Sequence, residues 1–144
     1  MNSEADHTIL VGTWTYRSFV NDPVLSTQFN DLEFGRANLR IDPAPMHDFK
    51  GLIYGEGWQL DLKGSTHYGY PFLVRFQGKG MVGNEEWIYD YLGFLVPPWP
   101  NGINQRPAIT GSIVRTVPHS SGDGNVAPAG VVCSWIAVKQ DAAP

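Results

Sequence analysis

The chain has 144 residues, of which 42% are apolar and 17% charged, so it fits a single domain with its own hydrophobic core. Its 16 Gly and 11 Pro residues indicate many turns and few long helices, which favours an all-β protein. The formal net charge of −4, without any cluster of Lys or Arg, excludes a nucleic-acid partner because binding to phosphate backbones needs concentrated positive charge.

Three features of the sequence bear on the compartment. No stretch approaches the roughly 20 apolar residues of a membrane helix, so we expect no membrane partner. The opening MNSEADHTILVG carries acidic side chains and only a short apolar run, unlike a secretory signal. The single cysteine, Cys133, has no second cysteine with which to form a disulfide, which fits a reducing compartment. We therefore expect a cytoplasmic protein.

Alternation of apolar and polar residues, interrupted by Gly, Pro and Asn, predicts eight strands. In chain order they cover residues 9–19, 37–42, 51–55, 58–63, 72–79, 86–95, 108–116 and 131–140. The fourth shows the pattern most clearly, because Trp58, Leu60 and Leu62 face one way and the residues between them are polar. The fifth repeats it, with Leu73 as an apolar residue on the outer face.

The connections between these strands hold no helical pattern of useful length. Three of them are long: 20–36, 96–107 and 117–129. Strands without parallel crossovers predict an eight-stranded antiparallel up-and-down barrel, since closure removes the exposed sheet edges. A two-sheet β-sandwich is the alternative. We expect one barrel domain over residues 9–140, with tails at 1–8 and 141–144.

The first predicted strand opens with Gly12-Thr13-Trp14. This opening, followed by seven further strands, resembles the calycin group of small β-barrels, the lipocalins, avidins and their relatives. The resemblance implies that Trp14 plugs the closed end of the barrel, where glycine lets two backbones approach closely. In that group a cation from the final strand often lies across the indole. An eighth strand antiparallel to the first would bring Lys139 to the level of Trp14, for a contact of roughly 0.5 to 1 kcal/mol.

The sequence predicts neither a cofactor nor a metal ion. Its opening is also similar to that of nitrobindin-like haem barrels, but the further glycines and the Tyr-Pro pair of that group are missing after TWTYRSF. His7, His47 and His67 lie far apart in the chain and show no metal-ligand spacing. Sequence motifs of nucleotide-binding proteins and of nucleophilic enzymes are absent as well.

In an up-and-down barrel, the connections after the first, third, fifth and seventh strands share one rim. This rim lies opposite the expected Trp14 floor, so it predicts the mouth of a ligand pocket. Apolar walls with one cation suit a small aromatic or apolar molecule that bears a carboxylate or phenolate. The residues expected to face inward in the upper half are Tyr16, Trp58, Phe76, Trp87, Tyr89, Arg115 and Cys133.

The sequence leaves open which faces of the sixth and seventh strands point inward. Ile109 and Ile113 favour an inward Arg115, which would clamp a carboxylate through paired hydrogen bonds. Val114 favours the opposite face. Asp90 lies either inside, as a buried general base, or on an apolar outer patch. If Asp90 points inward, the tyrosines beside it point out.

Three functions fit these features. The first is a small-molecule carrier, which the aromatic lining favours. The second is a cofactor-independent isomerase, cyclase or hydratase, with His119 or Asp90 as the base and Tyr89 or Arg115 stabilising negative charge. For His119, near the expected mouth, plain solvation is the alternative. The third is a homo-oligomeric interaction module that pairs through the outer residues Leu73, Ile88, Leu92 and Phe94.

Overall fold

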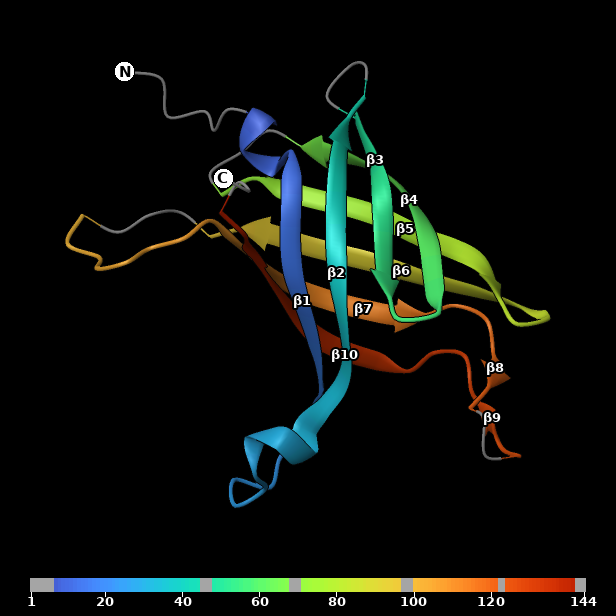
Figure 1. Ribbon diagram of the computed structural model, residues 1–144. Coiled ribbons are helices and arrows are strands. Elements are labelled where there is room, and N and C mark those ends of the chain that lie inside the picture. Colours follow the sequence, from blue (N-terminus) through green and yellow to red (C-terminus); the bar gives the residue numbers. More distant parts are fainter. Residues whose placement is uncertain (1–6, 45–47, 68–70, 97–99, 122–123, 142–144) are drawn as a thin grey trace.

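The computed structural model of the chain describes residues 7–44, 48–67, 71–96, 100–121 and 124–141. Eight long strands close into one antiparallel barrel (Figure 1), in the order β1-β10-β7-β6-β5-β4-β3-β2. Their bounds are β1 Gly12–Val20, β2 Glu33–Pro43, β3 Asp48–Gly55, β4 Trp58–His67, β5 Leu73–Val82, β6 Glu85–Leu95, β7 Ala108–Arg115 and β10 Val132–Lys139. The predicted up-and-down barrel is confirmed, and the alternative of a two-sheet sandwich is wrong.

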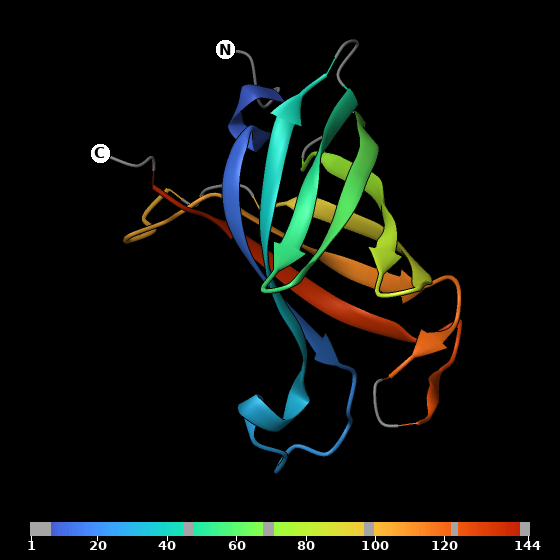
Figure 2. The ribbon, with the colours of Figure 1, turned by 45° about the vertical axis from the view of Figure 1, so that its right-hand side comes forward.

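The remaining elements are short. Single 3-10 turns, η1 and η2, cover His7–Leu10 and Phe29–Leu32, and strands β8 (His119–Ser120) and β9 (Val126–Ala127) form a small hairpin after β7. The loop that carries η2 and the β8–β9 hairpin project from the same end of the barrel (Figure 2). No helix among the described residues has the length and hydropathy needed to cross a membrane. Most of both expected tails, and His47, lie outside the described residues.

Alternating burial along the strands follows the period-two pattern of the sequence. In β4, for example, Leu60 and Leu62 are buried while Asp61 is exposed. Side chains fill the half of the barrel near β1's first residues: Trp14, Leu39, Ile41, Leu62, Val74, Leu95, Ile109 and Ala137 are all buried. This half is therefore packed core, and any cavity must lie toward the other end.

The floor of the barrel is closed by Trp14, which has no exposed surface. Trp14 pairs with Lys139 across β1 and β10, and the Lys139 ammonium lies 5.9 Å from the indole centroid. The ammonium also donates a 2.7 Å hydrogen bond to the Ile9 carbonyl, while the indole Nε1 donates to the Leu10 carbonyl at 3.0 Å. Gly12 has a φ of 142°, and a Cβ there would lie 3.0 Å from Lys139 Cε, so glycine is required. The predicted contact between Lys139 and Trp14 is confirmed.

The boundaries of some predicted elements differ from the structure. The first strand begins at Gly12 and not at residue 9, because the bonds from Trp14 and Lys139 hold residues 7–10 as a 3-10 turn. The second strand begins at Glu33, since its pairing with β1 continues past an irregularity at Ser18 to Phe19. The predicted long connection 20–36 is therefore shorter. The predicted connection 117–129 contains the β8–β9 hairpin.

Candidate functional site

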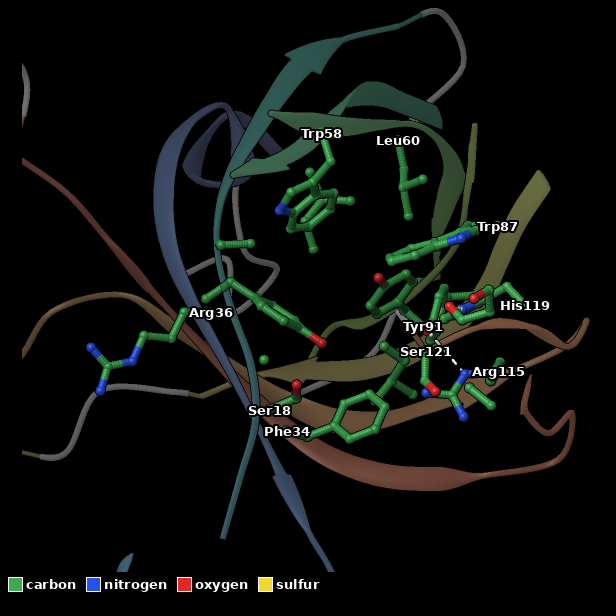
Figure 3. A pocket seen from close by; sticks show the side chains of 18 residues that line it. Ser18, Phe34, Arg36, Trp58, Leu60, Trp87, Tyr91, Arg115, His119 and Ser121 are labelled. Atoms are coloured by element: carbon green, nitrogen blue, oxygen red, sulfur yellow. Dashed lines mark hydrogen bonds between the residues drawn. The ribbon is translucent and has the colours of Figure 1, made fainter. Parts of the chain in front are cut away.

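A pocket of about 510 Å³ lies at the end of the barrel opposite Trp14 (Figure 3). Its lining residues come from strands β1, β2, β3, β4, β6 and β7 and from the β8–β9 hairpin region. The pocket lies at the rim where the sequence predicted the mouth. Its lining includes the Phe, Tyr and Trp side chains of six residues: Tyr16, Phe34, Trp58, Trp87, Tyr89 and Tyr91.

Two inward positions of β2 leave room for this pocket because they carry little or no side chain. Gly35 pairs with Ser18, and Ala37 pairs with Tyr16, so neither position of β2 fills the space between the walls. Further down the same strand Leu39 is fully buried and helps to fill the interior. The sequence of β2 thus changes from filling the barrel to lining it.

Strand β6 supplies one wall of the pocket. Trp87, Tyr89 and Tyr91 alternate along it toward the interior, and all three line the pocket. Asp90, between the tyrosines, is exposed on the outer face, where its carboxylate accepts a 3.2 Å hydrogen bond from Gln77 Nε2. The open question of register is therefore answered in favour of inward tyrosines, and Asp90 is not part of the pocket.

Arg115, at the end of β7, pairs with Tyr89 and is only 7% exposed. Its Nε donates to the Tyr89 hydroxyl at 3.1 Å, and its Nη1 donates to the Pro128 carbonyl at 3.2 Å. The guanidinium carbon lies 5.3 Å from the Phe34 ring centroid, and Figure 3 shows the two side chains next to each other. None of the ion pairs between described residues includes Arg115. A buried cation without a described carboxylate partner is a strong feature for holding an anion.

His119 is 5% exposed and lies at the pocket, although the sequence left solvation open. Its ring stacks on Trp87, with centroids 3.9 Å apart and an interplanar angle of 12°. Nδ1 lies 2.9 Å from the Ser120 carbonyl oxygen and Nε2 lies 2.7 Å from the Tyr89 hydroxyl. Because a carbonyl only accepts, we assign the proton of the neutral ring to Nδ1, which leaves Nε2 to accept from Tyr89.

Three tyrosines inside the barrel have raised pKa values because burial disfavours the phenolate. For Tyr89, the Arg115 guanidinium lowers the pKa by a smaller amount than burial raises it. For Tyr16, burial raises the pKa by more than the nearby Ser18 side chain lowers it, and the hydroxyl has no hydrogen-bond partner among the described residues. All three side chains are therefore neutral phenols at neutral pH, whose hydroxyls can donate or accept hydrogen bonds.

The raised tyrosine pKa values predict that the protein loses stability at alkaline pH. Above about pH 10 the unfolded chain releases tyrosine protons that the folded barrel retains, so the free energy of unfolding falls by up to about 1.4 kcal/mol per pH unit for each tyrosine. The double substitution Tyr16→Phe and Tyr91→Phe removes two of these groups and makes the fall shallower. Melting temperatures followed by circular dichroism from pH 8 to 11 check this, and an equal fall in both proteins contradicts it.

The other residues expected at the site lie beneath it. Phe76 is buried and stacks on Tyr91 with centroids 4.6 Å apart, which supports the wall without belonging to the pocket surface. Cys133 is also buried, and burial raises the pKa of its thiol. Tyr16, Trp58, Trp87, Tyr89 and Arg115 are brought together around the pocket as expected.

Several lining residues were missed by the sequence reasoning. Phe34 and Gly35 fell inside the connection predicted for residues 20–36, and they belong instead to β2. Tyr91 follows Tyr89 by two residues on the same strand, so strict alternation was the signal that could have found it. Ser120 and Ser121 come from the β8–β9 region, for which the sequence gives no orientation.

The polar side-chain groups of the pocket are hydroxyls, indole N–H groups, one imidazole and guanidinium groups. Within the described residues, no three His, Cys, Asp or Glu side chains gather in a way that would hold a metal ion. The described lining residues include neither Asp nor Glu, and of their two arginines Arg115 is buried, whereas Arg36 is exposed, is paired with Glu33 and points away from the pocket (Figure 3). Comparison of the chain with protein-family models, with curated proteins and with solved structures gave no match, so the case for its function rests on the geometry of this pocket.

Proposed function

We propose that the protein binds a small aromatic or apolar molecule that bears an anionic group, most simply a carboxylate. The observation that carries this proposal is Arg115, a buried guanidinium in an aromatic pocket without an ion-pair partner among the described residues. A buried charge is costly unless it is compensated. An anionic ligand supplies the compensation, and the surrounding rings supply apolar contact.

The size and composition of the pocket support the same proposal. Small-molecule sites commonly enclose roughly 300 to 1,000 Å³ and combine apolar walls with a few polar groups. At about 510 Å³ this pocket is of that size. Trp58 and Trp87 lie with ring centroids 6.5 Å apart and offer flat surfaces for stacking an aromatic ligand.

We also propose that the barrel is calycin-like. The support is its floor, where Gly12, Trp14 and Lys139 take the arrangement that the resemblance implies. We propose the cytoplasm as the compartment, because the single cysteine of the chain has no second cysteine with which to form a disulfide.

The proposal predicts that aromatic carboxylates quench tryptophan fluorescence at micromolar concentration, which corresponds to about −8 kcal/mol of binding. Naphthalene-2-carboxylate and its neutral amide are suitable probes, with the amide binding more weakly because it does not compensate Arg115. The variant Trp58→Phe/Trp87→Phe serves as the control, because it removes the two tryptophans that line the pocket and should lose most of the signal. If neither probe binds, and no member of a wider panel of aromatic and apolar ligands binds either, the proposal is wrong.

A second candidate is catalysis of proton transfer on the bound molecule. The observation in its favour is the hydrogen-bonded series from Arg115 through Tyr89 to His119, because such a series can stabilise developing negative charge and move a proton. A native mass spectrum of freshly purified protein, followed by analysis of the released molecule after long incubation, separates the two functions. A carrier returns its ligand unchanged, whereas an enzyme returns a product.

The same native mass spectrum reports the number of subunits. We propose the outer face of β5 and β6 as the contact surface of a homo-oligomer, because Leu73 and Phe94 are paired there and Phe94 is 45% exposed. Leu92 lies on the same face, opposite Arg75. An exclusively monomeric mass would speak against this surface as an interface.

A further inference from the structure

Tyr89 has one hydrogen to donate, and the bonds around it show where that hydrogen goes. Its oxygen accepts from Arg115 Nε at 3.1 Å, and with a neutral His119 its hydrogen is donated to Nε2 at 2.7 Å. The Nδ1 proton of His119 is held by the Ser120 carbonyl at 2.9 Å. In this state Tyr89 has no hydrogen left for a ligand.

Protonation of His119 changes this pattern without moving any heavy atom. The imidazolium carries hydrogens on both nitrogens, so Nε2 donates to the Tyr89 oxygen while Nδ1 keeps its bond to Ser120. Two donors, Nε2 and Arg115 Nε, then face the Tyr89 oxygen. The hydroxyl hydrogen of Tyr89 must turn away from His119, and Tyr89 lines the pocket, so an acceptor bound there receives it.

Charged groups lie near His119 on two neighbouring strands. From β7, the Arg115 guanidinium is separated from the imidazole by only the Tyr89 hydroxyl and disfavours a second positive charge. From β6, the Glu85 carboxylate accepts the Ser120 N–H at 2.9 and 3.0 Å and favours it. The paired strand β9, Val126–Ala127, carries no titratable side chain, and Asp123 lies outside the described residues. An anion placed beside Arg115 cancels the unfavourable charge.

We infer that His119 and Tyr89 form a proton-dependent half of the anion site, so that binding of an anionic ligand beside Arg115 is coupled to uptake of one proton by His119. This inference rests on the proposed function of the pocket. The bound anion is then stabilised by the Arg115 guanidinium, by a hydrogen bond from the Tyr89 hydroxyl and by the positive charge of His119. By thermodynamic linkage, a proton on His119 strengthens anion binding by the same factor by which a bound anion strengthens proton binding.

The sign of the pH dependence follows directly. Imidazoles commonly change charge between pH 5 and 8, whereas an aromatic carboxylate stays ionised above about pH 5. Affinity for the carboxylate therefore rises as the pH falls through this range. Affinity for the neutral amide changes less over this range, because its carbonyl can accept the Tyr89 hydrogen but brings no charge to offset Arg115.

Isothermal calorimetry with naphthalene-2-carboxylate and its amide, from pH 5.5 to 8, tests the inference. We expect about tenfold tighter binding of the carboxylate at pH 5.5 than at pH 8, a typical coupling between two sites. Titrations in buffers of different ionisation enthalpy should show uptake of up to one proton by the unaltered protein. His119→Gln should bind the carboxylate with a flat pH profile, whereas the matched control His67→Gln, on exposed β4 surface, should keep the slope.

The possible outcomes separate this inference from the proposed function. Tight but pH-independent binding to the unaltered protein, without proton uptake, overturns the inference and leaves the anion site of Arg115 intact. A slope that survives in His119→Gln overturns it too, because another group then takes the proton. Failure of both probes and of the wider ligand panel to bind at any pH overturns the proposed function and the inference together. If His119→Gln does not fold, the proton count of the unaltered protein still decides.

Discussion

Replacing Arg115 by methionine will lower the affinity for naphthalene-2-carboxylate by about 100-fold, because a charge-assisted hydrogen bond to a buried partner contributes about 1.5 to 3 kcal/mol. Methionine keeps most of the apolar volume of the arginine side chain, so the pocket should retain its shape. The neutral amide has no anion to lose and should bind within about threefold of its original affinity. Titration of tryptophan fluorescence with both probes measures the two effects in one preparation.

The matched control for this substitution is Arg75→Met. Arg75 is exposed on the outer face of β5, away from the pocket, and its loss changes the net charge by the same amount. If both variants weaken carboxylate binding equally, long-range attraction and not a built site explains the preference for anions. If Arg115→Met binds the carboxylate as tightly as the unaltered protein, Arg115 does not hold the anionic group.

Replacing Trp14 by alanine will lower the free energy of unfolding by about 3 to 5 kcal/mol, as large-to-small substitutions in a core do. Trp14 has no exposed surface, and its indole joins the first strand to η1 and to Lys139. Its loss opens a cavity at the floor and leaves the Leu10 carbonyl without its donor. For a domain of this length the melting temperature should fall by about 10 °C.

Chemical denaturation of two further variants separates the contributions to this loss. Trp14→Phe keeps an aromatic plug and should cost less than alanine. Lys139→Met removes only the cation and its hydrogen bond to the Ile9 carbonyl, and it should lower the free energy of unfolding by about 1 to 2 kcal/mol. A loss below about 1 kcal/mol for Trp14→Ala would mean that the barrel end does not depend on this side chain.

Much of the fold could be predicted because period-two alternation is a local signal. It gave the eight strands, with boundaries within a few residues, and the antiparallel closure followed from the absence of crossovers. The β8–β9 hairpin escaped because two-residue strands carry no periodicity. The start of the first strand was misplaced because residues 7–10 are held by bonds from Trp14 and Lys139, which depend on contacts far apart in the chain.

The site could be predicted only in part, for a similar reason. Alternation assigns Tyr16 and Trp58 to the inside, but on β7 both Ile113 and Val114 are apolar, so the sequence alone did not choose a face for Arg115. Pairing of Arg115 with the inward Tyr89 settles that face. His119 was expected near the mouth, but the sequence did not decide between a solvated side chain and a site residue, because its burial depends on stacking against Trp87 at the end of a long connection.

The seam between β1 and β10 has a consequence for how the chain is made. A growing polypeptide emerges with β1 first and must wait through more than a hundred residues before β10 is available to pair with it. Until then the edges of β1 and β7 are unpaired and open to other chains. During synthesis the barrel therefore stays open and prone to aggregation until β10 leaves the ribosome. Chaperones that shield strand edges should matter most before that point.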